Sequence, residues 1–421
     1  MTSPDTPTPD SPATASRLIL RGRIVSDGVE TPDGLIAVED DRIEYAGPAS
    51  GFDAAAFGGT EVPTPEGALL LPGLVDLHCH GAGGVDFPTA EEAGARQALE
   101  FLHAQGTTML LASLVTASRE ELLRAAELFA RLDAEDLIAG IHAEGPFLSH
   151  ARCGAQDPDF LLEPDVDFAM ELIETAGGAL ATMTYAPELP GASSLVDLLT
   201  VHGVTPSLGH TDCDDATAQA SLEQARDGLS AAGFDGAEGL PTVTHLFNAM
   251  PPMHHRSPGP VAACLRTAAD GGAVVELVAD GVHLAPAIVQ TVFRLVGGAN
   301  IALVTDSMAA AGLGDGSYTL GPSRVTVAGG VATLDSTGSI AGGTATLLEV
   351  VARTAAAGVP LPDAVFSATA VPAGVLGRAD EFGSLRRGLR ADVVATDPDL
   401  GLVAVVRGGR VLGAAGSPSQ G

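Results

Sequence analysis

Eight apolar segments recur through the middle of the chain, and this repetition limits the fold more than any other feature. The segments are 74–80, 107–114, 137–146, 181–188, 205–210, 241–247, 273–283 and 301–308. Stretches with helical spacing of apolar residues separate several of them, for example 91–106 and 119–134. Eight strands that alternate with helices favour a closed (β/α)8 barrel over an open sheet. The sequence therefore predicts an α/β protein with a TIM-like barrel.

The two ends of the chain share a different pattern, in which short strand-like runs are separated by Asp and Gly turns. We therefore expect both ends to build one small β-sandwich domain from residues 16–70 and 380–421. The barrel would then be inserted between them at residues 71–379. Residues 1–15 are rich in Pro, Ser, Thr and Asp, a composition typical of a disordered N-terminal tail.

Side chains that can bind a metal or move a proton stand at the ends of the predicted strands. The C-terminal ends of barrel strands all face the same mouth, where the active site of this fold lies. Residues far apart in the chain would therefore converge there. They are His78, His80, Glu144, His210, His245, His283 and Asp306.

The segment His78-Cys79-His80 has a spacing that suits metal binding. Side chains at positions i and i+2 of a strand point to the same face, so both imidazoles can bind one cation while Cys79 points away. An isolated HxH is weak evidence, but five of the eleven histidines stand at strand ends together with Glu144 and Asp306. This joint pattern predicts a site for a borderline divalent metal such as zinc or iron.

The charge of the chain excludes several classes of function. Its 421 residues include 53 acidic and 21 basic side chains, which give a formal net charge of −32. Such a chain repels a phosphate backbone, so we expect no nucleic-acid partner. All of the basic residues are Arg, and the absence of Lys excludes a Schiff base, a P-loop ATPase and a carboxylated-lysine metal bridge.

The chain also shows no signal for membrane insertion or secretion. No run of eighteen apolar residues occurs, and the first fifteen residues lack both the charged start and the apolar core of a signal peptide. Four widely spaced cysteines without a CxxC pair are typical of reduced thiols. We therefore expect a cytoplasmic protein without a membrane partner.

The order of the polar residues resembles that of the amidohydrolase superfamily: HxH on the first strand, His on the fifth and sixth, and Asp on the eighth. Many members bridge two metals with a carboxylated Lys, which this chain lacks. The members that use a Glu after the third strand instead are the N-acetylglucosamine-6-phosphate deacetylases. Segments that resemble theirs, in the same order, are LPGLVDLHCHG, HAEGPFLS, LGHT, THLFNAMPPMHHRSPG, ADGVH, LVTDSMAAAG and GSIAGGTATL.

This resemblance covers nearly the whole chain from about Arg17 and implies a reaction, the hydrolysis of N-acetyl-D-glucosamine 6-phosphate to D-glucosamine 6-phosphate and acetate. It implies that the principal metal is held by Glu144, His210 and His245. The HxH pair would add a second metal bridged by Glu144, so that one or two divalent cations are expected. Asp306 would take a proton from water and deliver it to the departing amine.

The resemblance also implies how a phosphorylated amino sugar is bound. Arg256 would contact the phosphate, either within its own chain or from a neighbouring subunit of a homodimer, because an Arg fork matches phosphate geometry. The remaining residues expected to contact the sugar or the phosphate are His283, Asn248, Ala249, Ile340, Ala341 and Gly342.

One segment departs from the family. After EGPFLS, relatives commonly carry a basic residue, Gly, a small residue and His, whereas this chain has Gln156 in place of the His. Gln156 can still donate a hydrogen bond to the substrate, and Cys153 is either an inert loop residue or a thiolate ligand of the empty enzyme. Alternative functions are deacetylation of the galactosamine epimer, another amidohydrolase reaction, and a non-catalytic scaffold, which the filled ligand positions disfavour.

Overall fold

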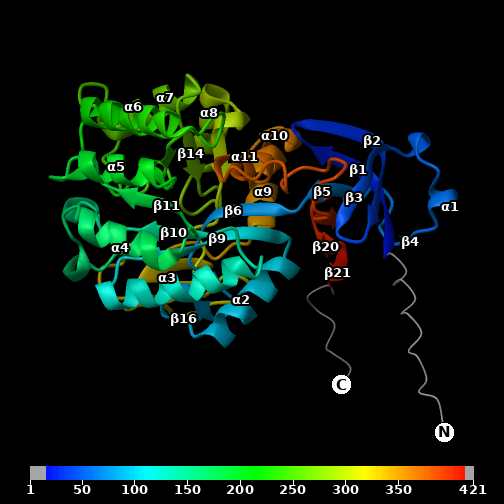
Figure 1. Ribbon diagram of the computed structural model, residues 1–421, viewed down its shortest axis with the longest axis horizontal. Coiled ribbons are helices and arrows are strands. Elements are labelled where there is room, and N and C mark those ends of the chain that lie inside the picture. The colour runs from blue at the N-terminus through cyan, green and yellow to red at the C-terminus, as the bar shows by residue number, and fades with distance from the viewer. Residues whose placement is uncertain (1–15, 413–421) are drawn as a thin grey trace, which may run out of the picture.

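The structure is a computed structural model, and it describes residues 16–412. The tail predicted at residues 1–15 and the last nine residues of the predicted small domain lie outside the described residues. Figure 1 shows two parts side by side: a large α/β part that holds the middle of the chain, and a small β part in which the blue N-terminal and red C-terminal segments meet.

Eight parallel strands form the wall of a barrel, and they follow one another around it in chain order. The apolar segments predicted as strands all contribute one, so the TIM-like barrel is confirmed. The strands are β6 (Leu74–Cys79), β9 (Thr107–Val115), β10 (Ile141–Glu144), β11 (Leu180–Tyr185), β12 (Thr205–Leu208), β13 (Thr242–Val243), β14 (Val274–Leu277) and β15 (Ile301–Leu303).

The first and last strands close the barrel through residues that follow them. Cys79 pairs with Ser307 in an isolated parallel bridge, and the His80 N–H donates to the Ser307 carbonyl at 2.7 Å. The Asp306 N–H donates to the His78 carbonyl at 2.9 Å. Closure therefore brings the HxH segment directly beside Asp306.

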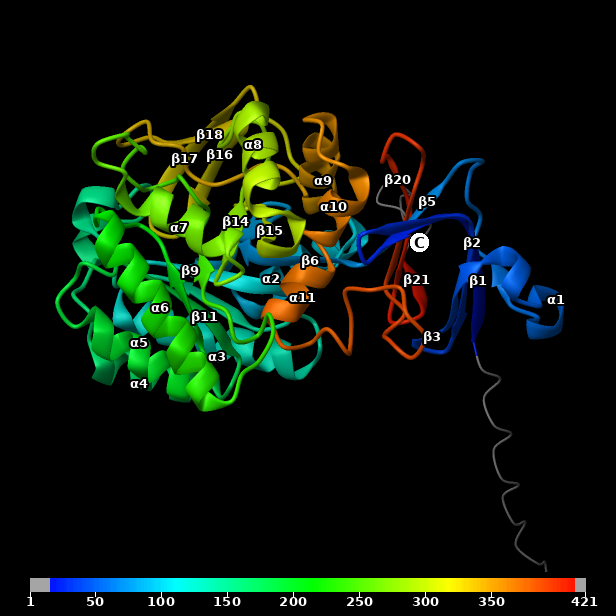
Figure 2. The same cartoon turned by 90° about the horizontal axis from the view of Figure 1, so that it is seen from above.

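Helices cover the outside of the barrel, as the view in Figure 2 shows. Two of them, α2 and α3, lie in the stretches that the sequence predicted to be helical. The helices around the barrel are α2 (Glu92–Ala104), α3 (Arg119–Ala134), α4 (Val166–Ala176), α5 (Ala192–Val201), α6 (Asp215–Ala232), α7 (Gly259–Ala269), α8 (Pro286–Val296), α9 (Leu347–Ala356), α10 (Leu361–Phe366) and α11 (Ala370–Val375). In residues 16–412, no helix is long and apolar enough to cross a membrane.

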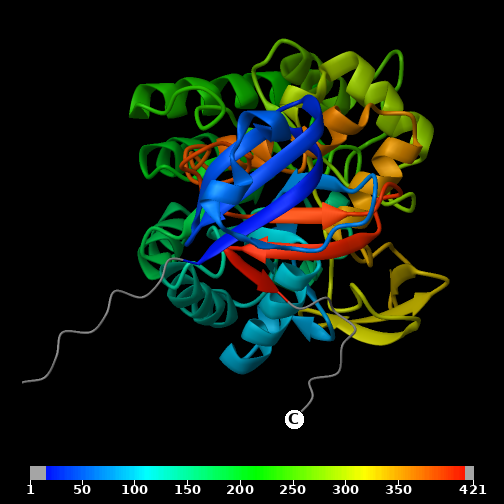
Figure 3. The ribbon, with the colours of Figure 1, turned by 90° about the vertical axis from the view of Figure 1, so that its right-hand side faces the viewer.

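The small domain contains strands from both ends of the chain, as predicted (Figure 3). Its strands form one continuous sheet in the order β21-β20-β19-β5-β1-β2-β3, with β4 beside β1. Apolar side chains from both halves of this sheet share one core, so the sheet packs against itself. The elements are β1 (Arg17–Ser26), β2 (Val29–Glu39), β3 (Arg42–Pro48), α1 (Ala54–Phe57), β4 (Thr60–Glu61), β5 (Leu69–Pro72), β19 (Val393–Thr396), β20 (Leu402–Arg407) and β21 (Arg410–Leu412).

A three-stranded antiparallel sheet within the barrel part was not predicted. It consists of β16 (Gly316–Leu320), β17 (Ser323–Ala328) and β18 (Val331–Leu334). A short hairpin, β7 (Gly81–Ala82) and β8 (Val85–Asp86), follows the HxH segment. The buried Asp86 carboxylate accepts the Gly321 N–H at 3.0 Å and thereby fastens the added sheet to the barrel.

A buried histidine stands where α2 meets the small domain, and it makes stability depend on pH. The His103 Nε2–H donates to the Leu137 carbonyl at 3.0 Å. Burial, together with the nearby Arg407 guanidinium, lowers the pKa of His103 to about 3. In the unfolded chain this imidazole titrates near pH 6.5, so below that pH the unfolded state binds one more proton than the folded state.

We therefore expect His103 to reduce stability as the pH falls from about 6.5 toward 3, and to have no effect above that window. Between pH 7 and pH 5 its contribution to the free energy of unfolding drops by about 2 kcal/mol. Urea unfolding of the wild type and of His103→Gln at both pH values measures this contribution as a change in their stability difference. His202→Gln, at the exposed end of α5, controls for the loss of a histidine as such. A pH-independent difference would contradict the prediction.

Candidate metal centre and active site

The residues that carry the site stand in the last positions of the barrel strands, as His78 and Glu144 do, or in the loops just beyond them. Most of the strands end earlier than predicted, and the next few residues turn into the barrel mouth. Three of them adopt a left-handed backbone that non-glycine residues rarely use: φ is 51° at His210, 25° at His245 and 47° at Asp306. Such strain persists only where surrounding contacts fix it, and it concentrates at functional sites.

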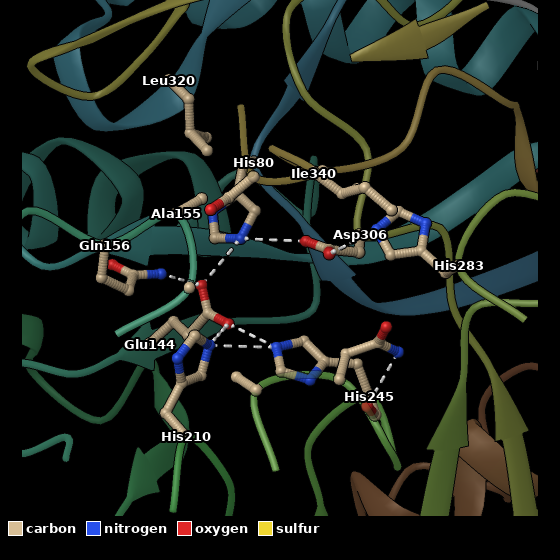
Figure 4. Close-up of a pocket in the computed structure, with 15 residues that line it drawn as sticks. His80, Glu144, Ala155, Gln156, His210, His245, His283, Asp306, Leu320 and Ile340 are labelled. Atoms are coloured by element: carbon tan, nitrogen blue, oxygen red, sulfur yellow. Dashed lines mark hydrogen bonds and ion pairs between the residues drawn. The ribbon is translucent and has the colours of Figure 1, made fainter. Parts of the chain in front are cut away.

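The first cluster in the mouth consists of Glu144, His210 and His245, all buried. One carboxylate oxygen of Glu144, Oε1, is 3.0 Å from His210 Nε2 and 2.9 Å from His245 Nε2. The two imidazole nitrogens are themselves 3.1 Å apart. Figure 4 shows both rings pointing at the carboxylate.

The second cluster consists of His78, His80 and Asp306. The two Nε2 atoms are 3.0 Å apart, and Asp306 Oδ1 is 3.4 Å from each of them. The other oxygen of Glu144, Oε2, is 3.1 Å from His80 Nε2. Glu144 therefore lies between the two clusters and contacts both.

The hydrogen bonds on the far side of the rings show that these residues fit a cation. Three imidazoles have an oxygen that can only accept beside Nδ1, so Nδ1 carries the proton. These contacts are His210 to the Arg152 carbonyl at 2.9 Å, His80 to the Ser113 carbonyl at 3.2 Å, and His78 to Glu276 Oε2 at 3.1 Å. In the neutral rings the Nε2 lone pairs then face one another, which is favourable only when a positive charge lies between them.

The charges of the site also call for a cation. Burial alone would raise the pKa of Glu144, but His78, His210 and His245 outweigh it and hold that pKa well below its usual value. Burial likewise opposes ionisation of Asp306, yet the nearby His78 and His80 lower its pKa. Both carboxylates are therefore ionised at neutral pH. Burial opposes a charge on His78 and His80, but Glu144 and Asp306 outweigh it and raise the pKa of both imidazoles, so the negative charge is compensated either by protons on these rings or by a cation that takes their place.

The mouth opens into a cavity of about 230 Å³. Six of the residues predicted to contact the substrate line it: Gln156, Asn248, Ala249, His283, Ile340 and Gly342. The adjacent Ala341 is fully buried and packs beneath the three-stranded sheet instead. Leu320, at the end of β16, also faces the cavity (Figure 4).

His283 is held in place by a carboxylate that the sequence did not single out. Its Nδ1 is 2.8 Å from Asp280 Oδ2, and its Nε2 faces Asp306 Oδ2 at 3.7 Å. Burial opposes a charge on this imidazole, but Asp280 and Asp306 outweigh it and raise the pKa of His283. His283 can therefore present a proton toward the cavity.

Gln156 is engaged by the protein at both ends of its amide. Its Nε2 donates to Glu144 Oε2 at 2.5 Å, and its Oε1 accepts the Thr116 N–H at 2.7 Å. The residue lines the cavity as predicted, but its amide N–H in this arrangement points at Glu144 (Figure 4).

Arg256 is the predicted residue that the single chain does not bring to the cavity. It lies in an exposed loop, where its Nη1 is 2.8 Å from His255 Nε2, and it is absent from the cavity lining. The sequence left open whether Arg256 contacts the phosphate within its own chain or in a neighbouring subunit. In the described chain alone, Arg256 does not line the cavity, so a contact within its own chain is not seen.

Two buried polar residues next to the site were missed. His142 precedes Glu144 by two positions on β10, and its ring nitrogens are 2.9 Å from Ser113 Oγ and 2.8 Å from Thr184 Oγ1. Glu276 contacts His78 from β14. A charged residue in the otherwise apolar run VVELV was a signal that could have identified Glu276.

Comparisons with known proteins show the family of the chain. The model of the amidohydrolase family matches residues 69–412. The chain is 34% identical over 336 residues to the N-acetylglucosamine-6-phosphate deacetylase of Bacillus subtilis, covering 78% of this chain and 79% of that protein. It is 33% identical to that of Vibrio furnissii over 357 residues, 83% of this chain and 85% of the relative.

Among solved structures, the chain is similar to a mutant N-acetyl-D-glucosamine-6-phosphate deacetylase from Mycobacterium smegmatis in complex with N-acetyl-D-glucosamine-6-phosphate. The TM-score is 0.83 at 35% identity, over 94% of this chain and 99% of that one. The deacetylase from Pasteurella multocida, at 23% identity, has the same fold with a TM-score of 0.83. The chain therefore belongs to the amidohydrolase family and, within it, to the N-acetylglucosamine-6-phosphate deacetylases.

Proposed function

We propose that the chain hydrolyses N-acetyl-D-glucosamine 6-phosphate to D-glucosamine 6-phosphate and acetate with the help of divalent cations. The observation that carries this proposal is the convergence of four imidazole Nε2 atoms on Glu144, with an ionised Asp306 beside them at the floor of an open cavity. The relatives that share this family carry the same activity in their names.

Glu144, His210 and His245 would hold the principal cation, and His78 and His80 a second one, with Glu144 between them. The mixed nitrogen and carboxylate donors suit zinc or iron. Such a cation polarises the acetyl carbonyl and makes water a stronger nucleophile near neutral pH. The protein's own part is to hold these donor atoms in the orientation that the cations require.

Asp306 would move the proton. Its low pKa leaves the carboxylate free to accept a proton from the attacking water, and the same oxygen can then return it to the departing amine. His283 Nε2, 3.7 Å from Asp306 Oδ2, would orient the carboxylate and contact the sugar or its phosphate. Asn248, Ala249 and the segment from Ile340 to Gly342 would bind the sugar ring.

Gln156 and Arg256 would have different tasks. Gln156, which is bonded to Glu144, would donate to the substrate only after reorienting its amide. Arg256, which is exposed and does not line the cavity of its own chain, would reach the phosphate in a neighbouring subunit, which makes a homodimer part of the proposal. We further propose a cytoplasmic location, since the four cysteines are all free thiols, as is usual for proteins of a reducing compartment.

The first test is acetate release by purified protein. We expect the metal-loaded protein to release acetate from N-acetyl-D-glucosamine 6-phosphate and to lose this activity on chelation, with recovery on adding zinc or iron. The galactosamine epimer and both unphosphorylated sugars serve as comparisons, because one inverted hydroxyl changes which buried donors stay unpaired. Faster turnover of the galactosamine epimer, or of an amide that is not a sugar, would replace the proposed substrate.

The second test concerns Asp306. Asp306→Asn keeps the size and the oxygen near His78 and His80 but cannot accept the proton, so kcat should fall by about 100-fold or more while the metal content per chain stays the same. Elemental analysis and steady-state kinetics measure the two effects. Asp215→Asn, the same change on the surface of α6, is the control. Loss of metal together with activity would make Asp306 chiefly a ligand.

The third test concerns Arg256. Arg256→Ala should raise KM for the phosphorylated sugar by about tenfold or more, since a charged hydrogen bond to phosphate is lost, with little effect on the unphosphorylated sugar. Arg266→Ala, another exposed arginine, ion-paired with Asp215, is the matched control. Equal losses on both sugars would show that Arg256 does not contact the phosphate.

A further inference from the structure

A buried carboxylate that the proposed chemistry does not use lies against the metal centre from outside the cavity. Glu276 occupies the third position of β14 and is 1% exposed. It does not line the cavity, so it cannot contact the substrate. A carboxylate that is buried but not catalytic needs another reason for its place, because burying a charge without compensation is costly.

One oxygen of Glu276 serves both halves of the metal centre. Oε2 accepts from His78 Nδ1 at 3.1 Å and from the main-chain N–H of His245 at 3.1 Å. His78 belongs to the second cluster and His245 to the first. The bond to His245 also supports a residue whose φ of 25° is strained. Within residues 16–412, Oε1 has no hydrogen-bond partner, so the protein compensates the charge through Oε2 alone.

His78 differs from the other three imidazoles of the metal centre in the kind of group that accepts the hydrogen bond from its Nδ1–H. His80 and His210 donate to main-chain carbonyls, and His245 Nδ1 is buried with no partner among the described residues. Of these four imidazoles in the described part of the chain, only His78 donates its Nδ1–H to a carboxylate. A full negative charge at that position fixes the Nδ1–H tautomer more strongly and makes Nε2 a better donor to a cation.

The net charge of the whole metal centre also favours a second cation. Three carboxylates contact the four imidazoles: Glu144 and Asp306 inside the cavity and Glu276 behind it. With neutral imidazoles, as metal binding requires, one divalent cation leaves the centre negative, and two make it positive. A positive centre is the state that attracts an anionic sugar phosphate into a chain of strongly negative net charge.

We propose that Glu276 is a positioning residue: it holds His78 for the second cation and ties the His78–His80 pair to the loop that carries His245. Together with Glu144 it links the two clusters from opposite sides of His78. This inference rests on the proposed function in that it takes the centre to bind divalent cations, but its test does not require turnover.

The test is calorimetric titration of the metal-free protein with Zn²⁺, for the wild type, Glu276→Gln and Glu276→Leu. We expect two binding events in the wild type. In Glu276→Leu, the second should weaken by about tenfold or more, with the first changed less than about threefold, since losing an outer-shell partner typically weakens metal binding 10- to 100-fold. Glu276→Gln keeps an acceptor oxygen but not the charge. The affinity of its second binding event should therefore lie between that of the wild type and that of Glu276→Leu.

Thr354→Val is the matched control. Thr354 is fully buried in α9, on the outside of the barrel, and donates its hydroxyl to the Val350 carbonyl at 2.8 Å, so both binding events should stay as in the wild type. Thermal melting of each metal-free variant checks that the barrel is folded. The Gln variant, which has the same shape as Glu, keeps the test valid if the Leu variant fails to fold.

Kinetics give the second readout. A positioning role predicts a lower kcat with little change in KM, and partial recovery of the Leu variant at millimolar Zn²⁺. A single binding event in the wild type, equal weakening of both events, or no change in either Glu276 variant would overturn the inference. If the wild type binds two cations and the Glu276 variants weaken only the second, but the wild type releases no acetate, then the proposed function fails and the role of Glu276 stands.

Discussion

The contact of one carboxylate with four imidazoles is the constraint around which the barrel mouth is built. Glu144 reaches His210 and His245 with one oxygen and His80 with the other, and His78 lies 3.6 Å from it. These rings come from segments that are far apart in the chain, and only a closed barrel brings them together. A chain without lysine cannot use a carboxylated lysine as a bridge, and Glu144 is the residue that we propose for this task.

A polar layer inside the barrel supports the site from behind. Ser113 and Thr184 bond to the two ring nitrogens of His142, and Thr184 continues to Thr244 at 2.8 Å. Burial, together with His78, lowers the pKa of His142 well below its usual value, so this imidazole is neutral and bonds as one donor and one acceptor. The layer fixes the strained loops without adding positive charge where a cation would bind.

The barrel could be predicted from the sequence because its signals are local, whereas the fine geometry depends on contacts that no local pattern reports. Apolar runs predicted all eight strands but extended most of them too far, since residues such as His210 turn into the mouth and are as buried as the strands. The sheet of β16–β18 was missed because its strands are short and half exposed. The hydrogen bond from Gln156 to Glu144 and the absence of Arg256 from the cavity lining depend on side-chain directions, which no local pattern reports.

The small domain has a consequence for how the protein is made. β5 pairs with β19, so that Leu70 stands opposite Ala395. During synthesis the N-terminal strands therefore emerge long before their neighbours and must wait, with one edge of the sheet unpaired, until nearly the whole chain has left the ribosome. Such an open edge invites wrong pairing, and contacts this distant in sequence form slowly. The barrel can assemble first, and the last strands to be translated then complete the sheet that the first ones began.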